Sequence, residues 1–126
     1  MPLPWTRTGS SFGFGPEGAH LPQPAWFGAL SVEAEQEDEE STLSLYRRLI
    51  ALRKELQGAE HLDWLPAQDG TQADTVLAFR RPGGWISVTN FGPSPIALPA
   101  GRILASSSAL RDGILSADTT VWLRSE

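Results

Sequence analysis

The chain of 126 residues contains no cysteine, which excludes disulfide bonds, thiolate metal ligands and cysteine nucleophiles. No apolar run approaches the roughly 18 residues that a membrane-spanning helix needs. Basic residues are also few: 10 Lys and Arg stand against 15 Asp and Glu, and the net charge of −5 argues against nucleic acid as a partner. No basic and apolar leader follows Met1, so we expect a cytoplasmic protein without a secretory signal that contacts neither membrane nor nucleic acid.

The residues that usually carry chemistry are scarce as well. The two histidines, His20 and His61, lie far apart in the chain, and neither has a second histidine at metal-ligand spacing. The glycines between Gly9 and Gly18 are not followed by Lys and Ser or Thr, so no phosphate-binding loop is present. No Gly-x-Ser-x-Gly element occurs either. We therefore expect no metal, no cofactor and no catalytic residue within this chain.

Hydrophobic residues make up 40% and charged residues 20% of the chain, enough apolar side chains for a folded core. Residues 1–32 hold almost no charge and half of the prolines, so neither a helical nor an alternating pattern persists there. This segment is nevertheless rich in aromatic residues, which disordered linkers lack. We expect an irregular loop that lies against another surface, and its aromatic residues are Trp5, Phe12, Phe14, Trp26 and Phe27.

A helix is predicted over residues 41–57. Six of the fifteen acids lie in residues 33–40, which is typical of a solvated helix start, and Asp38 or Ser41 can cap the helix. Gly58 is the expected stop signal. The apolar face covers about half of the circumference, which indicates a helix that is covered from two sides. That face comprises Leu43, Leu45, Tyr46, Leu49, Ile50, Leu52 and Leu56.

Residues 62–126 change to short apolar runs separated by turn residues, a pattern typical of an antiparallel sandwich. Pro82, Gly83 and Gly84 join two of these runs as a hairpin. The fold class is therefore mainly β with one N-terminal helix, preceded by a long loop. The strands are expected at 62–65, 75–81, 84–91, 95–98, 102–107 and 119–124.

Alternation within the strands separates two faces. Trp85 and Trp122 fall on the face whose other residues are polar. Either these two rings are covered, by the helix or by residues 1–32, or they are exposed as platforms for a flat ligand. The opposite face is the expected core, which comprises Val76 or Leu77, Phe79, Ile86, Val88, Val121 and Leu123.

Several segments occur in an order that resembles the C-terminal part of a bacterial α-glucosidase of glycoside hydrolase family 13, the α-amylase superfamily. They are Pro-Leu-Pro-Trp at 2–5, Phe-Gly-Phe at 12–14, Leu-Pro-Gln-Pro at 21–24, Val-Glu-Ala-Glu at 32–35, the helical stretch at 41–53, and strand segments at 76–81, 87–91 and 118–123.

The resemblance implies that residues 1–40 correspond to the loop after the eighth strand of a (β/α)8 barrel. Residues 41–57 would be the last barrel helix and residues 62–126 the C-terminal antiparallel β-domain. The three catalytic carboxylates of that family lie on earlier barrel strands and have no counterpart here, so we expect a fragment without activity of its own. The parent enzyme would hydrolyse terminal α-linked glucose with retention, and Trp5 and Arg7 would at most border its sugar pocket.

Three functions follow from the sequence as hypotheses. The chain is the structural C-terminal portion of such an enzyme, a free-standing carbohydrate-binding module that uses Trp85 and Trp122, or a β-domain that binds another protein. The expected partner is the parent barrel, and in its absence we expect a homodimer through the exposed helix face. The wide helix face and the aromatic loop favour the first hypothesis, because both need a covering surface.

Overall fold

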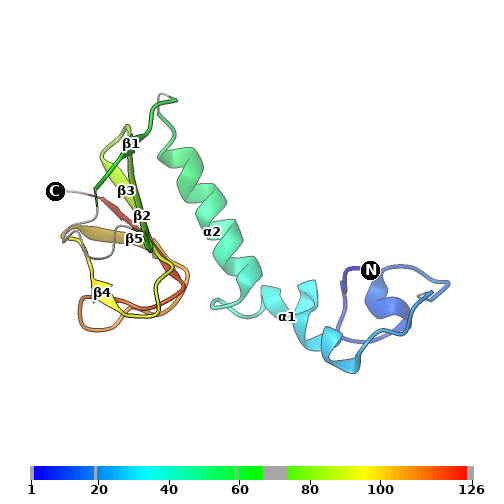
Figure 1. The fold of residues 1–126 in the computed structure, drawn as a ribbon. Coiled ribbons are helices and arrows are strands. Elements are labelled where there is room, and N and C mark those ends of the chain that lie inside the picture. The colour runs from blue at the N-terminus through cyan, green and yellow to red at the C-terminus, as the bar shows by residue number, and fades with distance from the viewer. Residues whose placement is uncertain (1, 19, 59, 67–73, 125–126) are drawn as a thin grey trace. The chain divides into compact units, whose positions relative to one another are not determined.

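The computed structural model describes residues 2–18, 20–58, 60–66 and 74–124. The chain divides into two compact units, Met1–Ala51 and Leu52–Glu126, which we call the N-terminal unit and the β-unit. The long helix α2, Thr42–Glu55, runs across the boundary between them (Figure 1).

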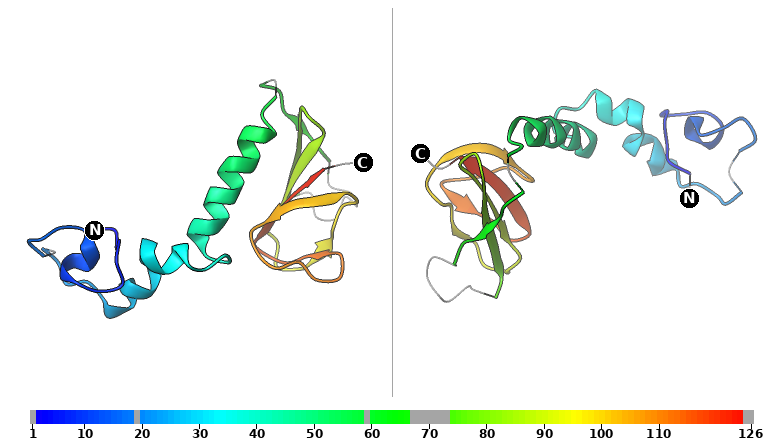
Figure 2. Two further views of the ribbon diagram at one scale, coloured as in Figure 1. Left: turned by 180° about the vertical axis from the view of Figure 1, so that it is seen from behind. Right: turned by 90° about the horizontal axis from the view of Figure 1, so that it is seen from above.

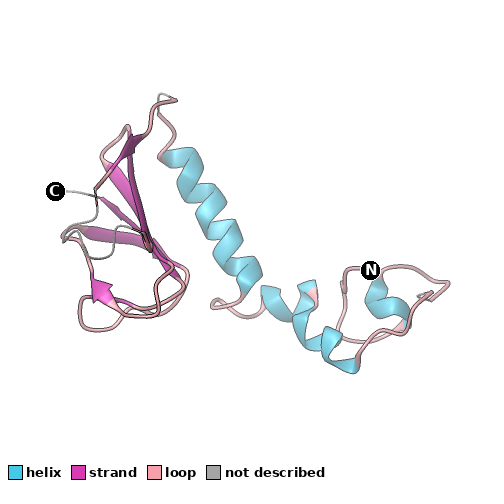
Figure 3. Ribbon diagram, viewed as in Figure 1, coloured by secondary structure: helices cyan, strands magenta, loops and turns pink. Residues whose placement is uncertain are grey.

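The N-terminal unit contains more regular structure than the sequence predicts. Its loop includes two 3₁₀ helices, η1 at Ser10–Gly13 and η2 at Ala25–Leu30, followed by the short helix α1 at Val32–Gln36 (Figure 3). The 3₁₀ turns are closed by local backbone hydrogen bonds, such as Phe27 N to Pro24 O at 3.1 Å. Elements of only four to six residues show no apolar periodicity, so the sequence pattern could not reveal them.

The acidic run forms two helix starts instead of one. Ser31 caps α1, since its Oγ accepts a hydrogen bond from Ala34 N at 3.2 Å. Ser41 caps α2, since its Oγ accepts from Ser44 N at 3.1 Å, as the sequence predicts. Asp38, the alternative cap, instead accepts from Glu40 N in the turn between the two helices.

The β-unit contains two antiparallel sheets, which confirms the predicted mainly-β fold (Figure 3). The larger one has five strands in the order β1-β2-β3-β7-β5, and the smaller one pairs β4 with β6. The strands are β1 Asp63–Trp64, β2 Val76–Arg81, β3 Trp85–Asn90, β4 Ile96–Ala97, β5 Arg102–Ser106, β6 Ile114–Leu115 and β7 Thr119–Arg124. The six predicted strands are all present; β7 has the predicted bounds, the other five are shortened, and β6 is the addition.

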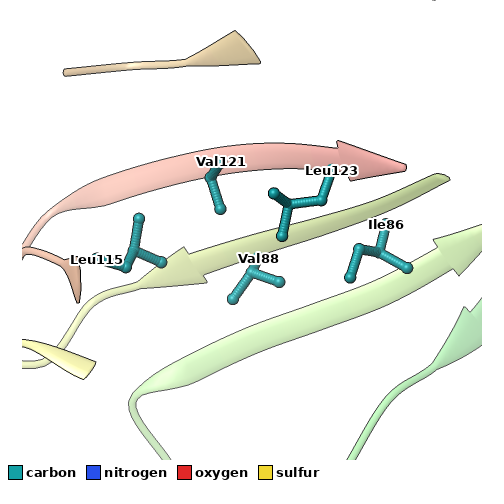
Figure 4. Close-up of a cluster of buried hydrophobic side chains, with 5 residues drawn as sticks. All are labelled: Ile86, Val88, Leu115, Val121 and Leu123. Atoms are coloured by element: carbon teal, nitrogen blue, oxygen red, sulfur yellow. The ribbon is translucent and has the colours of Figure 1, made fainter. Parts of the chain in front are cut away.

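The core of the β-unit lies between the two sheets. Figure 4 shows its five central side chains pointing toward one another from β3, β6 and β7. Ile96 of β4 packs against this cluster from the smaller sheet. Figure 2 shows the strands of the β-unit from two further sides. The cluster comprises Ile86, Val88, Leu115, Val121 and Leu123, of which Leu115, Val121 and Leu123 are fully buried.

The core in the structure differs from the predicted core at Phe79 and at Leu115. Val76 packs against the core cluster, and Leu77, the alternative, is exposed. Phe79 lies on the opposite face of β2, because alternation from Val76 and Ala78 turns it away from the core. Leu115 was missed, since β6 is only two residues long and carries no alternating pattern.

Gly58 does not act as a left-handed helix terminator. Its φ lies outside the left-handed region, and a Cβ there would lie 3.2 Å from the Cβ of Pro82. The glycine therefore permits close packing of the chain after α2 against the β2–β3 hairpin, within the β-unit.

Candidate functional site

The segment around Trp5 is fixed by backbone hydrogen bonds on two sides. Trp5 N and Thr6 N both donate to Phe12 O, at 2.7 and 2.9 Å. On the other side, Trp5 O accepts from Glu33 N at 3.0 Å. The start of the chain is thus tied both to η1 and to α1, although the segment belongs to neither.

Arg7 is held by acids of the predicted solvated run. Its backbone N–H donates to the carboxylate of Glu33 at 2.8 Å, and its guanidinium forms an ion pair with Glu37. Gly28 also lies against this residue, because a Cβ there would approach Arg7 O to 2.4 Å. Only glycine at position 28 therefore allows the Arg7 backbone this close to η2.

The two predicted pocket-border residues thus differ in their surroundings. The charge of Arg7 is engaged by Glu37, whereas the side chain of Trp5 is half exposed and forms no ring contact among the described residues. The geometry makes Trp5 the freer of the two to contact a ligand, and makes Arg7 a tether for its segment.

The acidic run serves the backbone of the N-terminal unit. Glu33 accepts from Arg7 N, and Glu35 accepts from Leu43 N at 3.0 Å at the start of α2. These are capping and tethering roles, in which a carboxylate supplies only acceptor oxygens. The arrangement gives no support for a catalytic carboxylate pair in the run.

A continuous aromatic face covers the larger sheet on the side away from the core. The ring centroids follow one another at 6.1, 6.3 and 4.9 Å across β1, β2, β3 and β7. The four rings of this aromatic face belong to Trp64, Phe79, Trp85 and Trp122.

Burial varies along the aromatic face. Trp85 is buried, which agrees with the covered alternative for this ring, and Trp122 is half-buried, whereas Trp64 on the edge strand is 66% exposed. The rings of Trp85 and Trp122 are inclined at 43°, so they do not form two coplanar, exposed platforms. The indole Nε1 of Trp85 is buried without a hydrogen-bond partner in the described part of the chain.

Sequence reasoning missed Trp64 and Phe79 as members of this face. The signal that could have found them is the register, in which Trp64 pairs with Phe79 and Phe79 with Ser87. Directly paired residues share one face of a sheet, but the pairing partners cannot be read from a single strand.

Neither histidine belongs to a metal site in the described chain. His61 Nε2 lies 2.8 Å from the Asp63 carboxylate in an exposed pair, and His20 is exposed. Over the described ranges, no cluster of three or more His, Cys, Asp or Glu side chains could hold a metal ion. Nor does any helix in these ranges have the length and apolarity needed to cross a bilayer.

Solved structures of a trehalulose synthase and of a trehalose-6-phosphate hydrolase share this fold. A mutant of the trehalulose synthase MutB matches 98% of the chain with a TM-score of 0.69 and 24% identity, and the match spans 24% of that enzyme. MutB from Pseudomonas mesoacidophila MX-45 matches 90% of the chain at 23% identity with a TM-score of 0.63, over 23% of its own length. A mutant of the trehalose-6-phosphate hydrolase TreA from Bacillus licheniformis matches 96% of the chain at 18% identity with a TM-score of 0.72, over 24% of its length.

These likenesses show that the chain has the fold of a part of glycoside hydrolase family 13 enzymes, as the sequence resemblance predicts. The chain spans about a quarter of the length of the enzymes it matches. No family model matches the sequence, and no curated protein matches it.

Proposed function

We propose that the chain is the C-terminal structural portion of a glycoside hydrolase family 13 enzyme whose remaining part carries the catalytic carboxylates. The observation that carries this proposal is the shared fold over 98% of this chain, set against only 24% of the matching enzyme. A retaining glycosidase needs two carboxyl groups about 5 Å apart in contrasting environments. The acids around Arg7 act as tethers. The two catalytic carboxyl groups would therefore belong to the remaining part of the parent enzyme.

The surface of the N-terminal unit supports a covering partner. Its described part contains one buried large hydrophobic residue, Phe27. Many other apolar side chains there are exposed, more than an isolated protein surface usually carries in one place. We infer that the catalytic barrel covers them, and they are Leu3, Trp5, Phe14, Leu21, Trp26, Leu30, Tyr46 and Ile50.

The names of the matching enzymes support a structural and not a catalytic role. One is a trehalulose synthase and the other a trehalose-6-phosphate hydrolase, yet both contain this portion with TM-scores of 0.69 and 0.72. A portion shared by enzymes with different reactions is unsuited to decide between them. We propose a parent of the α-glucosidase type, which hydrolyses terminal α-linked glucose with retention.

Two measurements test this function. The reading frame upstream of the codon for Met1 should encode a (β/α)8 barrel. The isolated chain should not hydrolyse a chromogenic α-glucoside at high protein concentration, with an intact family 13 α-glucosidase as the positive control. Turnover that copurifies with the chain and is abolished by one substitution such as Glu33→Gln would overturn the proposal.

The protein-interaction hypothesis differs from this proposal in what it predicts upstream of Met1, because it requires no barrel there. The exposed apolar surface of the N-terminal unit would equally suit another protein. If the upstream reading frame encodes no barrel, the exposed apolar surface would be assigned to the binding of a separate protein. Burial of Trp85 and the inclined ring of Trp122 weigh against the carbohydrate-binding module.

A further inference from the structure

Three arginines and one tryptophan occupy a single row across four strands of the larger sheet. The register pairs Arg81 with Trp85 and Trp85 with Arg124. It then pairs Arg124 with Arg102 on β5. Directly paired residues share one face, so Arg81, Arg102 and Arg124, which we call the arginine row, lie on the side of the aromatic face.

The arginine row brings like charges together. Arg102 and Arg124 are direct cross-strand partners, an arrangement that destabilises a sheet. The backbone is adapted to this closeness at Gly101, because a Cβ there would lie 2.6 Å from Arg124 O. Any larger residue at position 101 would push β5 away from β7 at this point.

Nothing in the described chain neutralises the row. The ion pairs that the structure describes join Arg7 to Glu37 and His61 to Asp63, and none involves the arginine row. Among the described residues, the acids nearest in sequence to β2 and β7, Asp74 and Asp118, precede these strands and therefore lie at the opposite end of the sheet. Asp63 of β1 pairs with Arg80 at the same end as the row but on the other face, and its carboxylate lies 2.8 Å from His61 Nε2. Glu126, two residues after Arg124, lies outside the described residues. The described strand residues that share the face and the end of the arginine row therefore include no acid.

Local rules of this kind are broken mainly where function requires it. A guanidinium presents five N–H donors in a planar fork and no acceptor, so a row of three offers only donors. The complementary group is an anion with several oxygen acceptors, which guanidinium forks bind bidentately. Arg102 and Arg124 are exposed and Arg81 is half-buried, so an anion can reach the row from solvent.

We propose that the arginine row is a binding site for an oxyanion, a phosphate or a carboxylate group, held between Arg102 and Arg124 with Arg81 at its side. This site lies entirely in the β-unit and does not depend on the proposed parent enzyme. The anion would relieve the repulsion between the two directly paired arginines and so stabilise the folded chain.

The test measures the melting temperature of the full chain in phosphate against chloride at equal ionic strength. Three probes distinguish the source of the anion: inorganic phosphate, glucose 6-phosphate and a synthetic peptide of residues 33–40. Each probe that binds should raise the melting temperature, and its Kd should rise about tenfold in the R102Q/R124Q double variant. The R53Q/R111Q double variant removes the same charge elsewhere and should leave Kd unchanged.

The repulsion within the arginine row can also be tested without any ligand, through the melting temperature at low salt. At low salt, R102Q should melt at a higher temperature than the natural chain, since it removes like-charge repulsion, whereas R111Q should not. R102K/R124K keeps the charge but loses the planar forks, so it should weaken binding and keep the low-salt repulsion. Equal phosphate effects in R102Q/R124Q and R53Q/R111Q, or no stabilisation by any of the three probes, would overturn the proposal.

Discussion

Asn90 is the polar residue on which the core side of the β-unit depends. Its side chain is fully buried, and its amide nitrogen lies 2.9, 3.2 and 3.1 Å from the carbonyl oxygens of Ser94, Leu115 and Ser116. Its Oδ1 accepts from Gly92 N at 2.9 Å. One side chain therefore joins the end of β3 to β6 of the smaller sheet.

Replacing Asn90 by Ala should lower the free energy of unfolding by on the order of 3 kcal/mol, because buried carbonyls lose their donors. Asn90→Asp should be at least as damaging at neutral pH, since a carboxylate cannot donate to those carbonyls. Urea unfolding of the full chain, followed by circular dichroism, gives both values. An Asp variant as stable as the natural chain would show that the amide donors are unimportant.

Leu115 and Ile114 are neighbours in β6 with opposite surroundings. Leu115 is fully buried in the core cluster, whereas Ile114 is 42% exposed. Leu115→Ala should cost about 2–5 kcal/mol in the free energy of unfolding, since it leaves a cavity. Ile114→Ala is the matched control and should cost under about 1 kcal/mol. Equal losses in the same urea titration would contradict the assignment of Leu115 to the core.

At the scale of elements, the start of α2 shows how the acidic run is used. Ser41 both caps the helix and donates its hydroxyl to Glu35 O at 2.6 Å, which ties α2 to α1. The Glu35 carboxylate of α1 also accepts a hydrogen bond from Leu43 N of α2. The run therefore joins two helices, in addition to placing negative charge near helix N-termini.

Ser41→Ala should destabilise α2 by about 1 kcal/mol, because the Ser44 amide loses its capping acceptor. The measurement is hydrogen exchange of the Ser44 and Leu45 amides by NMR, which reports the opening of the first helical turn. Thr42→Ala, next in sequence and exposed, is the control and should leave both rates nearly unchanged. Faster exchange in the control variant alone would contradict the capping role.

At the scale of the whole molecule, the two units differ in how they are stabilised. The core cluster belongs entirely to the β-unit. The N-terminal unit is held by backbone hydrogen bonds, serine caps and the Arg7 tethers, with many apolar side chains exposed. Apolar burial among the described residues therefore contributes less to the stability of the N-terminal unit than to that of the β-unit.

Removing residues 1–51 should therefore leave a β-unit, 52–126, that melts cooperatively, and should abolish self-association. The full chain is expected to associate through the exposed apolar surface that includes Tyr46 and Ile50. Sedimentation velocity of the full chain and of 52–126 over the same concentration range compares the two. A full chain that stays monomeric at high concentration, or a 52–126 chain without a cooperative melt, would contradict this division of roles.

The sequence by itself determined six of the seven strands and the faces of β3 and β7, because side-chain alternation, turn glycines and helix caps act over a few residues. It placed Ile86, Val88, Val121 and Leu123 in the core and turned Trp85 away from it, as the structure has them. It also predicted the cap at Ser41. These features follow from local geometry, so one strand or one helix carries its own signal.

Only the tertiary structure decided which strands pair. The strand β6, the place of Phe79 beside Trp64 and the pairing of Arg102 with Arg124 all depend on partners distant in the sequence. The order β1-β2-β3-β7-β5 brings β7 between β3 and β5, which no local pattern encodes. Long-range pairing is set by the balance between closing long loops and burying two distant apolar faces together, and that balance is a property of the folded chain.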